Sequence, residues 1–236
     1  MISLFFSLVF VGLIEARVLL YPESVWPLAL LPVWAALSCW WTGRALGAAT
    51  IGFFLGALSL AFSLWAASAD AAHAGAVAGW ALFFALLYAL RTQRAGLVVL
   101  LSFIEVVLFF WLVLSLHLAL HLPLWALAPA VGAGAAALFF ASQTLMLELG
   151  FWLKLRLALL SFVAGLVMAE SFWMFSQLPF HVVNIDFLLG IVYYTLWNVT
   201  HRYFSLEFTK RSLWASAAML FLGFLAVLVS ARWFPN

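Results

Sequence analysis

The chain has 236 residues, of which 69% are hydrophobic and only 8% are charged, with a formal net charge of +2. A soluble domain carries about 25% charged residues, so this composition excludes a water-soluble globular protein. A charge this close to zero gives no reason to expect a nucleic-acid partner, since basic residues in membrane proteins mostly set topology. The partner that the composition predicts is the lipid bilayer.

Apolar runs long enough to cross a bilayer follow one another along the chain, and about nine can be separated by their short polar breaks. They cover residues 2–20, 25–41, 45–67, 74–90, 95–118, 124–146, 152–177, 182–200 and 212–233. The first run lacks a basic start and a small-residue cleavage site, so we expect a retained helix rather than a signal peptide. The sequence predicts an all-α fold, a polytopic transmembrane helix bundle with short loops, in one domain over residues 1–236.

Basic residues are concentrated in every second break. The ten lysines and arginines include eight at these positions: Arg44, Arg91, Arg94, Lys154, Arg156, Arg202, Lys210 and Arg211. Cytoplasmic loops of membrane proteins carry the excess of Lys and Arg, so we expect these breaks to be cytoplasmic. The N-terminus is then also predicted to lie in the cytoplasm.

Small residues gather at Gly52 and Gly56, at Gly75 and Gly79, and over residues 131–137. In lipid, such faces let two helices approach closely and are a main source of helix association. We interpret them as contacts inside one bundle. A homo-oligomer formed through the same faces is the alternative.

Glu105 is the ionisable residue expected nearest the midplane of the bilayer. Counted from the start of the run 95–118, it lies roughly 15 Å into the bilayer, near the midplane. A buried acid there is either neutral and hydrogen-bonded, for instance to polar side chains of the runs 124–146 or 182–200, or part of a proton relay. The sequence does not separate these two interpretations.

Four further charged residues are expected in one layer of the outer half of the membrane, roughly 20–26 Å from the cytoplasmic side. They are Glu15, Arg17, Glu170 and Asp186. Arg17 can pair with Glu170 or with Asp186 and so pin the bundle. Three acids against one base leave a surplus of carboxyls, which indicates a path for protons or cations.

His117 and His121 are four residues apart, the spacing that lets two histidines on one helix face share a metal ion. We favour ordinary residues at the membrane interface, and the metal pair is the alternative. Cys39 is the only cysteine, which excludes an intrachain disulfide and a cysteine-rich metal site. No Walker loop, Gly-x-Ser-x-Gly elbow or HExxH motif occurs, so we predict neither a cofactor nor an enzymatic activity.

The C-terminal third has a distinctive order of motifs. A Glu-x-Phe-Trp segment at 170–173 precedes Leu-Pro-Phe at 178–180, then a Tyr-Tyr pair at 193–194 and a basic turn. This order resembles multi-pass membrane proteins of ultra-small, candidate-phyla bacteria, a family with no assigned activity. The resemblance implies the inner membrane of a bacterium and nothing about a substrate.

Short loops, few polar residues and the lack of a known catalytic motif favour a non-enzymatic structural or accessory subunit of a membrane assembly, with another membrane protein as partner. The first alternative is a small permease or proton- or cation-linked transporter that uses the intramembrane carboxylates. The second alternative is an intramembrane lipid-modifying enzyme.

Overall fold

In the computed structural model, every regular element of the described part of the chain is an α-helix. The structure describes residues 9, 12–13, 30–43, 46–65, 69–92, 95–147, 149–178 and 180–230. Its labelled helices are α3 (Leu31–Gly43), α4 (Leu46–Trp65), α5 (Ala69–Thr92), α6 (Ala95–Leu120), α7 (Leu124–Met146), α8 (Phe151–Ser176), α9 (Val182–Phe204) and α10 (Lys210–Ser230).

Five of the described helices, α6 to α10, are long and apolar enough to cross a membrane. The protein is thus a helical membrane protein, and this part of the prediction is confirmed. The predicted run 2–20 lies almost wholly outside the described residues, as does the first part of the run 25–41. A count of nine spans and the side of the N-terminus therefore stay predictions.

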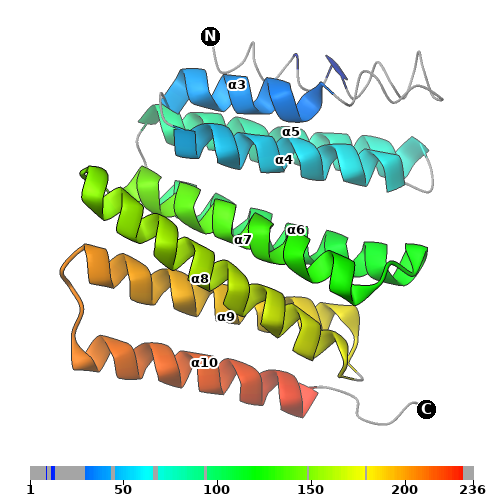
Figure 1. Ribbon diagram of the computed structural model, residues 1–236. Coiled ribbons are helices and arrows are strands. Elements are labelled where there is room, and N and C mark those ends of the chain that lie inside the picture. Colours follow the sequence, from blue (N-terminus) through cyan, green and yellow to red (C-terminus); the bar gives the residue numbers. More distant parts are fainter. Residues whose placement is uncertain are drawn as a thin grey trace. The chain divides into compact units, whose positions relative to one another are not determined.

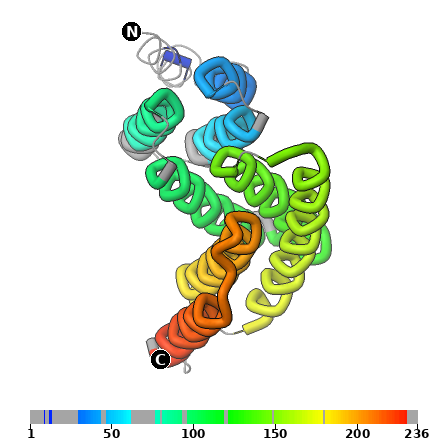
Figure 2. Tube along the Cα trace, turned by 90° about the vertical axis from the view of Figure 1, so that its left-hand side faces the viewer, coloured from blue at the N-terminus to red at the C-terminus, as the bar shows by residue number. Residues whose placement is uncertain are grey.

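Contacts between helices divide the chain into two compact units, Met1–Glu105 and Val106–Asn236, with the boundary inside α6. In the first unit, α3 packs along α4, and α5 packs against both (Figure 1). In the second unit, α8 crosses α7 at an angle, and α9 contacts both α8 and α10. The views in Figures 1 and 2 agree that α9 and α10 lie side by side.

Glycines allow the closest helix contacts of the first unit. A Cβ added to Gly52 would lie 2.6 Å from the carbonyl oxygen of Ala35, and one added to Gly56 would lie 2.7 Å from the carbonyl oxygen of Leu31. Real Cβ atoms do not approach so closely, so α3 can lie on α4 only because these positions lack a side chain. The predicted role of Gly52 and Gly56 in packing within the bundle is confirmed.

The crossing of α7 and α8 depends on a second pair of glycines. A Cβ on Gly132 would lie 2.9 Å from the carbonyl oxygen of Gly165. A Cβ on Gly165 would in turn collide with the carbonyl oxygen of Gly132. The two backbones therefore touch, as the small residues at 131–137 predicted.

Two helices end at residues in the left-handed conformation that glycine usually occupies. His121 (φ 51°) follows α6, and Leu206 (φ 60°) follows α9. At the second of these, the amide of Glu207 donates to the carbonyl of Arg202 over 3.0 Å, the bond that closes a Schellman motif.

Candidate functional site

Glu105 lies in the part of α6 that belongs to the first unit. Its side chain is only 2% exposed, and Oε2 has no hydrogen-bond partner in the described part of the chain. Ser102, one turn earlier, donates instead to the carbonyl of Val98 over 2.9 Å. The carboxyl also interacts electrostatically with the buried thiol of Cys39 in α3. A buried acid with an unused acceptor can take up a proton or a cation.

Three of the polar residues in the runs 124–146 and 182–200 form hydrogen bonds within their own unit. In α7, Ser142 and Gln143 bond to Trp197. In α9, Thr195 donates to the carbonyl of Ile191 over 2.8 Å. All of these bonds lie within the second unit.

Asp186 is the second buried carboxyl, and it lies near the start of α9. Its side chain is 7% exposed, and no described atom hydrogen-bonds to Oδ1. The neighbouring buried positions on the helix, Ile185 and Leu189, are apolar. Asp186, like Glu105, therefore has a buried carboxyl oxygen to which no described group donates a hydrogen bond.

The other members of the predicted layer are placed differently. Glu170 is exposed on α8, whereas Asp186 is buried on α9, so the second unit presents the two acids in different environments. Glu15 and Arg17 lie outside the described residues, so the pairing of Arg17 with Glu170 or Asp186 stays a prediction.

His117 and His121 have different local roles. Nδ1 of His117 lies 2.6 Å from the carbonyl oxygen of Leu122, which can only accept, so the ring donates and holds the turn after α6. His121 lies beyond the last residue of that helix and is exposed. The two histidines therefore do not lie on one face of a continuous helix. Among the described residues, no group of three or more His, Cys, Asp or Glu side chains could hold a metal ion.

A polar cluster connects α7, α9 and α10. We use this term for seven residues: Ser142, Gln143, Trp197, Asn198, His201, Arg202 and Ser216. The Gln143 amide nitrogen donates to the carbonyl of Trp197 over 2.9 Å, and the Trp197 indole donates to the Ser142 hydroxyl over 3.0 Å. The Asn198 amide nitrogen donates to the Ser216 hydroxyl over 3.2 Å, and Arg202 Nε donates to the Asn198 side-chain oxygen over 3.2 Å.

His201 joins this cluster through Gln143. Its Nδ1 lies 3.2 Å from Oε1 of Gln143, and its ring is stacked on Trp197 with a centroid separation of 4.9 Å and an interplanar angle of 5°. The amide nitrogen of Gln143 already donates to a carbonyl, so Oε1 must be the acceptor and Nδ1 must carry hydrogen. The neutral imidazole therefore keeps its lone pair at Nε2.

The sequence did not single out His201, because the predicted helix 182–200 ended one residue before it. The structure continues α9 to Phe204. The spacing of Trp197 and His201, four residues apart on one helix face, is the signal that could have revealed the stack.

Comparison with protein-family models, with curated proteins and with solved structures finds no match.

Proposed function

We propose that the protein is a small proton- or cation-linked membrane transporter in which Asp186 and Glu105 bind the transported charge. The observation that carries this proposal is that two membrane-capable helices, α9 and α6, each bury a carboxyl with an oxygen that no described group satisfies. An ionised carboxyl within a bilayer costs roughly 3 kcal/mol or more, so a cavity, a partner or a proton must compensate it.

A purely structural carboxyl would be expected to have its acceptors filled. Buried polar groups in proteins are nearly always hydrogen-bonded, and the described part of this chain follows that rule at Ser142, Gln143 and Ser161. Glu105 and Asp186 do not follow it. The unused oxygens favour a transient ligand, and a proton or a small cation is the ligand that a carboxyl binds.

The test is proton flux into liposomes that contain the purified protein and a trapped pH-sensitive dye. We expect Asp186→Asn and Glu105→Gln each to reduce the flux by about tenfold or more, since each variant lacks one of the two carboxyls that bind the transported charge. Glu170→Gln is the matched control, because it makes the same chemical change at an exposed carboxyl. Equal flux for wild type and both buried-site variants would overturn the proposal.

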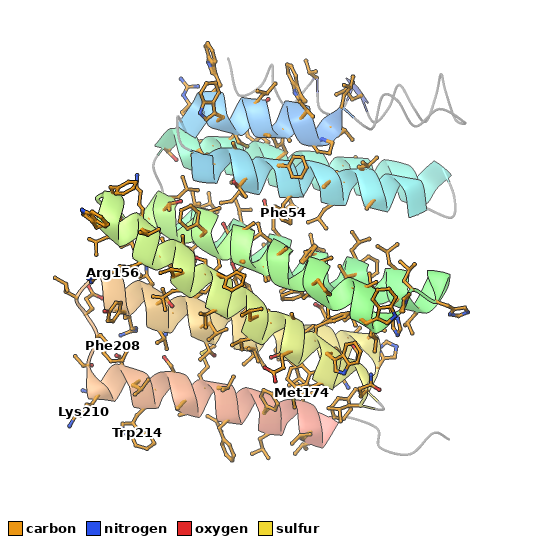
Figure 3. All side chains as sticks on the ribbon, viewed as in Figure 1. Phe54, Arg156, Met174, Phe208, Lys210 and Trp214 are labelled. Atoms are coloured by element: carbon orange, nitrogen blue, oxygen red, sulfur yellow. The ribbon has the colours of Figure 1, made fainter. Side chains whose placement is uncertain are left out.

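The transporter is proposed to lie in the inner membrane of a bacterium, with about nine spans and a cytoplasmic N-terminus. What supports this orientation is the placement of basic residues in the second unit. Figure 3 shows Arg156 of α8 and Lys210 of α10 at the same end. Arg202 lies near the end of α9, which the chain connects to the start of α10. An excess of basic residues at one end is typical of the cytoplasmic side.

An accessory subunit is the second candidate, and Glu170 favours it. This carboxyl is exposed on α8, and the apolar side chains of Leu166, Trp173 and Met174 on the same helix are 54%, 42% and 58% exposed. A charge on such a surface is compensated by a basic side chain from another helix. A stoichiometric partner that copurifies in mild detergent with wild type and is lost with Glu170→Gln would support this function. Wild-type protein that purifies alone would contradict it.

A further inference from the structure

The buried face of α9 carries a row of polar groups that leads away from Asp186. Asp186, Tyr193, Trp197 and His201 are separated by seven, four and four residues, which places them within about 80° of the helix circumference. Their positions extend over about 22 Å along the axis, most of the thickness of the apolar layer. Asp186 lies near the start of the helix and His201 near its end.

His201 is the titratable group of this row that can reach water. Its side chain is partly exposed, and Nε2 has no hydrogen-bond partner among the described residues and is not enclosed. Nδ1 is already committed to Gln143. Only Nε2 is therefore available to take up a proton.

The surroundings of the ring suit both of its protonation states. Gln143 Oε1 accepts from Nδ1–H in the neutral and in the charged form alike. The face of Trp197, parallel to the imidazole at 4.9 Å, stabilises the imidazolium by a cation–π interaction. The ring can thus gain and lose a proton at Nε2 without leaving its place.

The charged groups that act on the ring are of opposite sign. Arg202, the next residue of α9, and Glu207, in the turn that follows, interact with it electrostatically. The cluster residues that α7 and α10 contribute are uncharged. The remaining basic side chains near the starts of α8 and α10 are exposed: Lys154, Arg156, Lys210 and Arg211.

We propose that His201 exchanges protons between the aqueous phase and the α9 path to Asp186, with Gln143 and Trp197 as positioning residues. This inference rests on the proposed function and names the entry point of its path. A hydronium ion gives its proton to Nε2, which forms an N–H bond and the imidazolium. When that bond breaks, the proton passes through water along the row to the Asp186 carboxylate, which becomes a carboxylic acid, and the imidazole is neutral again.

The first test is the tautomer of His201, measured by nitrogen NMR of protein with labelled histidine in liposomes. We expect the neutral ring to carry hydrogen at Nδ1, and the signal is assigned by its loss in His201→Gln. Gln143→Leu should release the ring to the Nε2–H form that unconstrained imidazole prefers. A wild-type ring in the Nε2–H form, or one that does not titrate, would overturn the inference.

The second test is proton flux in the liposome assay. His201→Gln should lower the rate by about tenfold and remove its dependence on external pH near neutrality, because the variant cannot accept a proton. His181→Gln is the control, since His181 is exposed at the other end of α9. If Asp186→Asn loses flux while His201→Gln keeps the wild-type rate and pH profile, the inference that His201 is the entry point is overturned. The proposed transport function is unaffected by that result. A wild type that conducts no better than empty liposomes would overturn both.

Discussion

At the level of single residues, Gln143 joins α7 to α9 within the polar cluster. It is fully buried and bonds to the Trp197 carbonyl and to His201, two groups of a different helix. We expect Gln143→Leu to lower the free energy of unfolding by about 1–2 kcal/mol, because interhelical hydrogen bonds within membranes contribute up to about that much. Denaturant titration of the protein in detergent micelles measures this change.

Thr144 provides the comparison for this substitution. Its hydroxyl donates to the carbonyl of Ala141 in its own helix, over 2.9 Å, and bonds to no second helix among those that the structure describes. Thr144→Val should therefore change the stability by less than about 0.5 kcal/mol. Equal losses for the two variants would show that the bonds between α7 and α9 add nothing.

The sequence identified Glu105 and Asp186 because a carboxyl in an apolar run is conspicuous. It could not distinguish Asp186 from Glu170, which also has apolar neighbours but is exposed. The difference lies in which face of α8 the neighbouring helices cover, and that is decided by tertiary packing. The polar cluster was missed for a related reason, since its members only become neighbours when α7 and α9 pack together.

At the level of helices, the contact between Gly132 and Gly165 predicts that neither position tolerates a larger residue. Gly165→Ala would place a methyl group against the backbone of α7 and force the two helices apart. We expect a loss of about 1–3 kcal/mol in the free energy of unfolding, the usual cost of overpacking. Thermal unfolding in detergent, followed by circular dichroism, provides the measurement.

Gly96→Ala is the matched control for this prediction. Gly96 lies in α6 with nothing within 4 Å of a Cβ at that position. The alanine there should leave the stability unchanged or raise it slightly, because alanine is the better helix former. A Gly165→Ala protein as stable as the Gly96→Ala protein would contradict close packing of α7 on α8.

Helix positions were predictable where polar breaks are sharp. The run 124–146 coincides with α7, because Pro123 precedes it and the helix ends where the polar break begins. The end of α9 was not predictable in the same way, since His201 and Arg202 are polar yet helical. Their side chains bond to Gln143 and Asn198, which lets the helix continue past the apolar run.

At the level of the whole molecule, the sequence correctly predicted a membrane protein, because its composition suits only a lipid environment. It could not predict which helices pair. Faces toward lipid and faces toward other helices are equally apolar in a membrane protein, so hydropathy does not separate them. Trp214 illustrates this, since it projects outward from α10 and is 76% exposed although it is strongly hydrophobic (Figure 3).

The central claim is that buried carboxyls of the membrane helices take up and release protons. Infrared difference spectra of the protein in liposomes, recorded as the pH is changed, test it directly through the carbonyl band of protonated carboxylic acids. We predict a band that rises and falls reversibly with pH, part of which is lost in Asp186→Asn and part in Glu105→Gln, and all of which remains in Glu170→Gln. A carboxyl band that stays constant across the pH range, or one that is undiminished in both buried-site variants, would contradict the account.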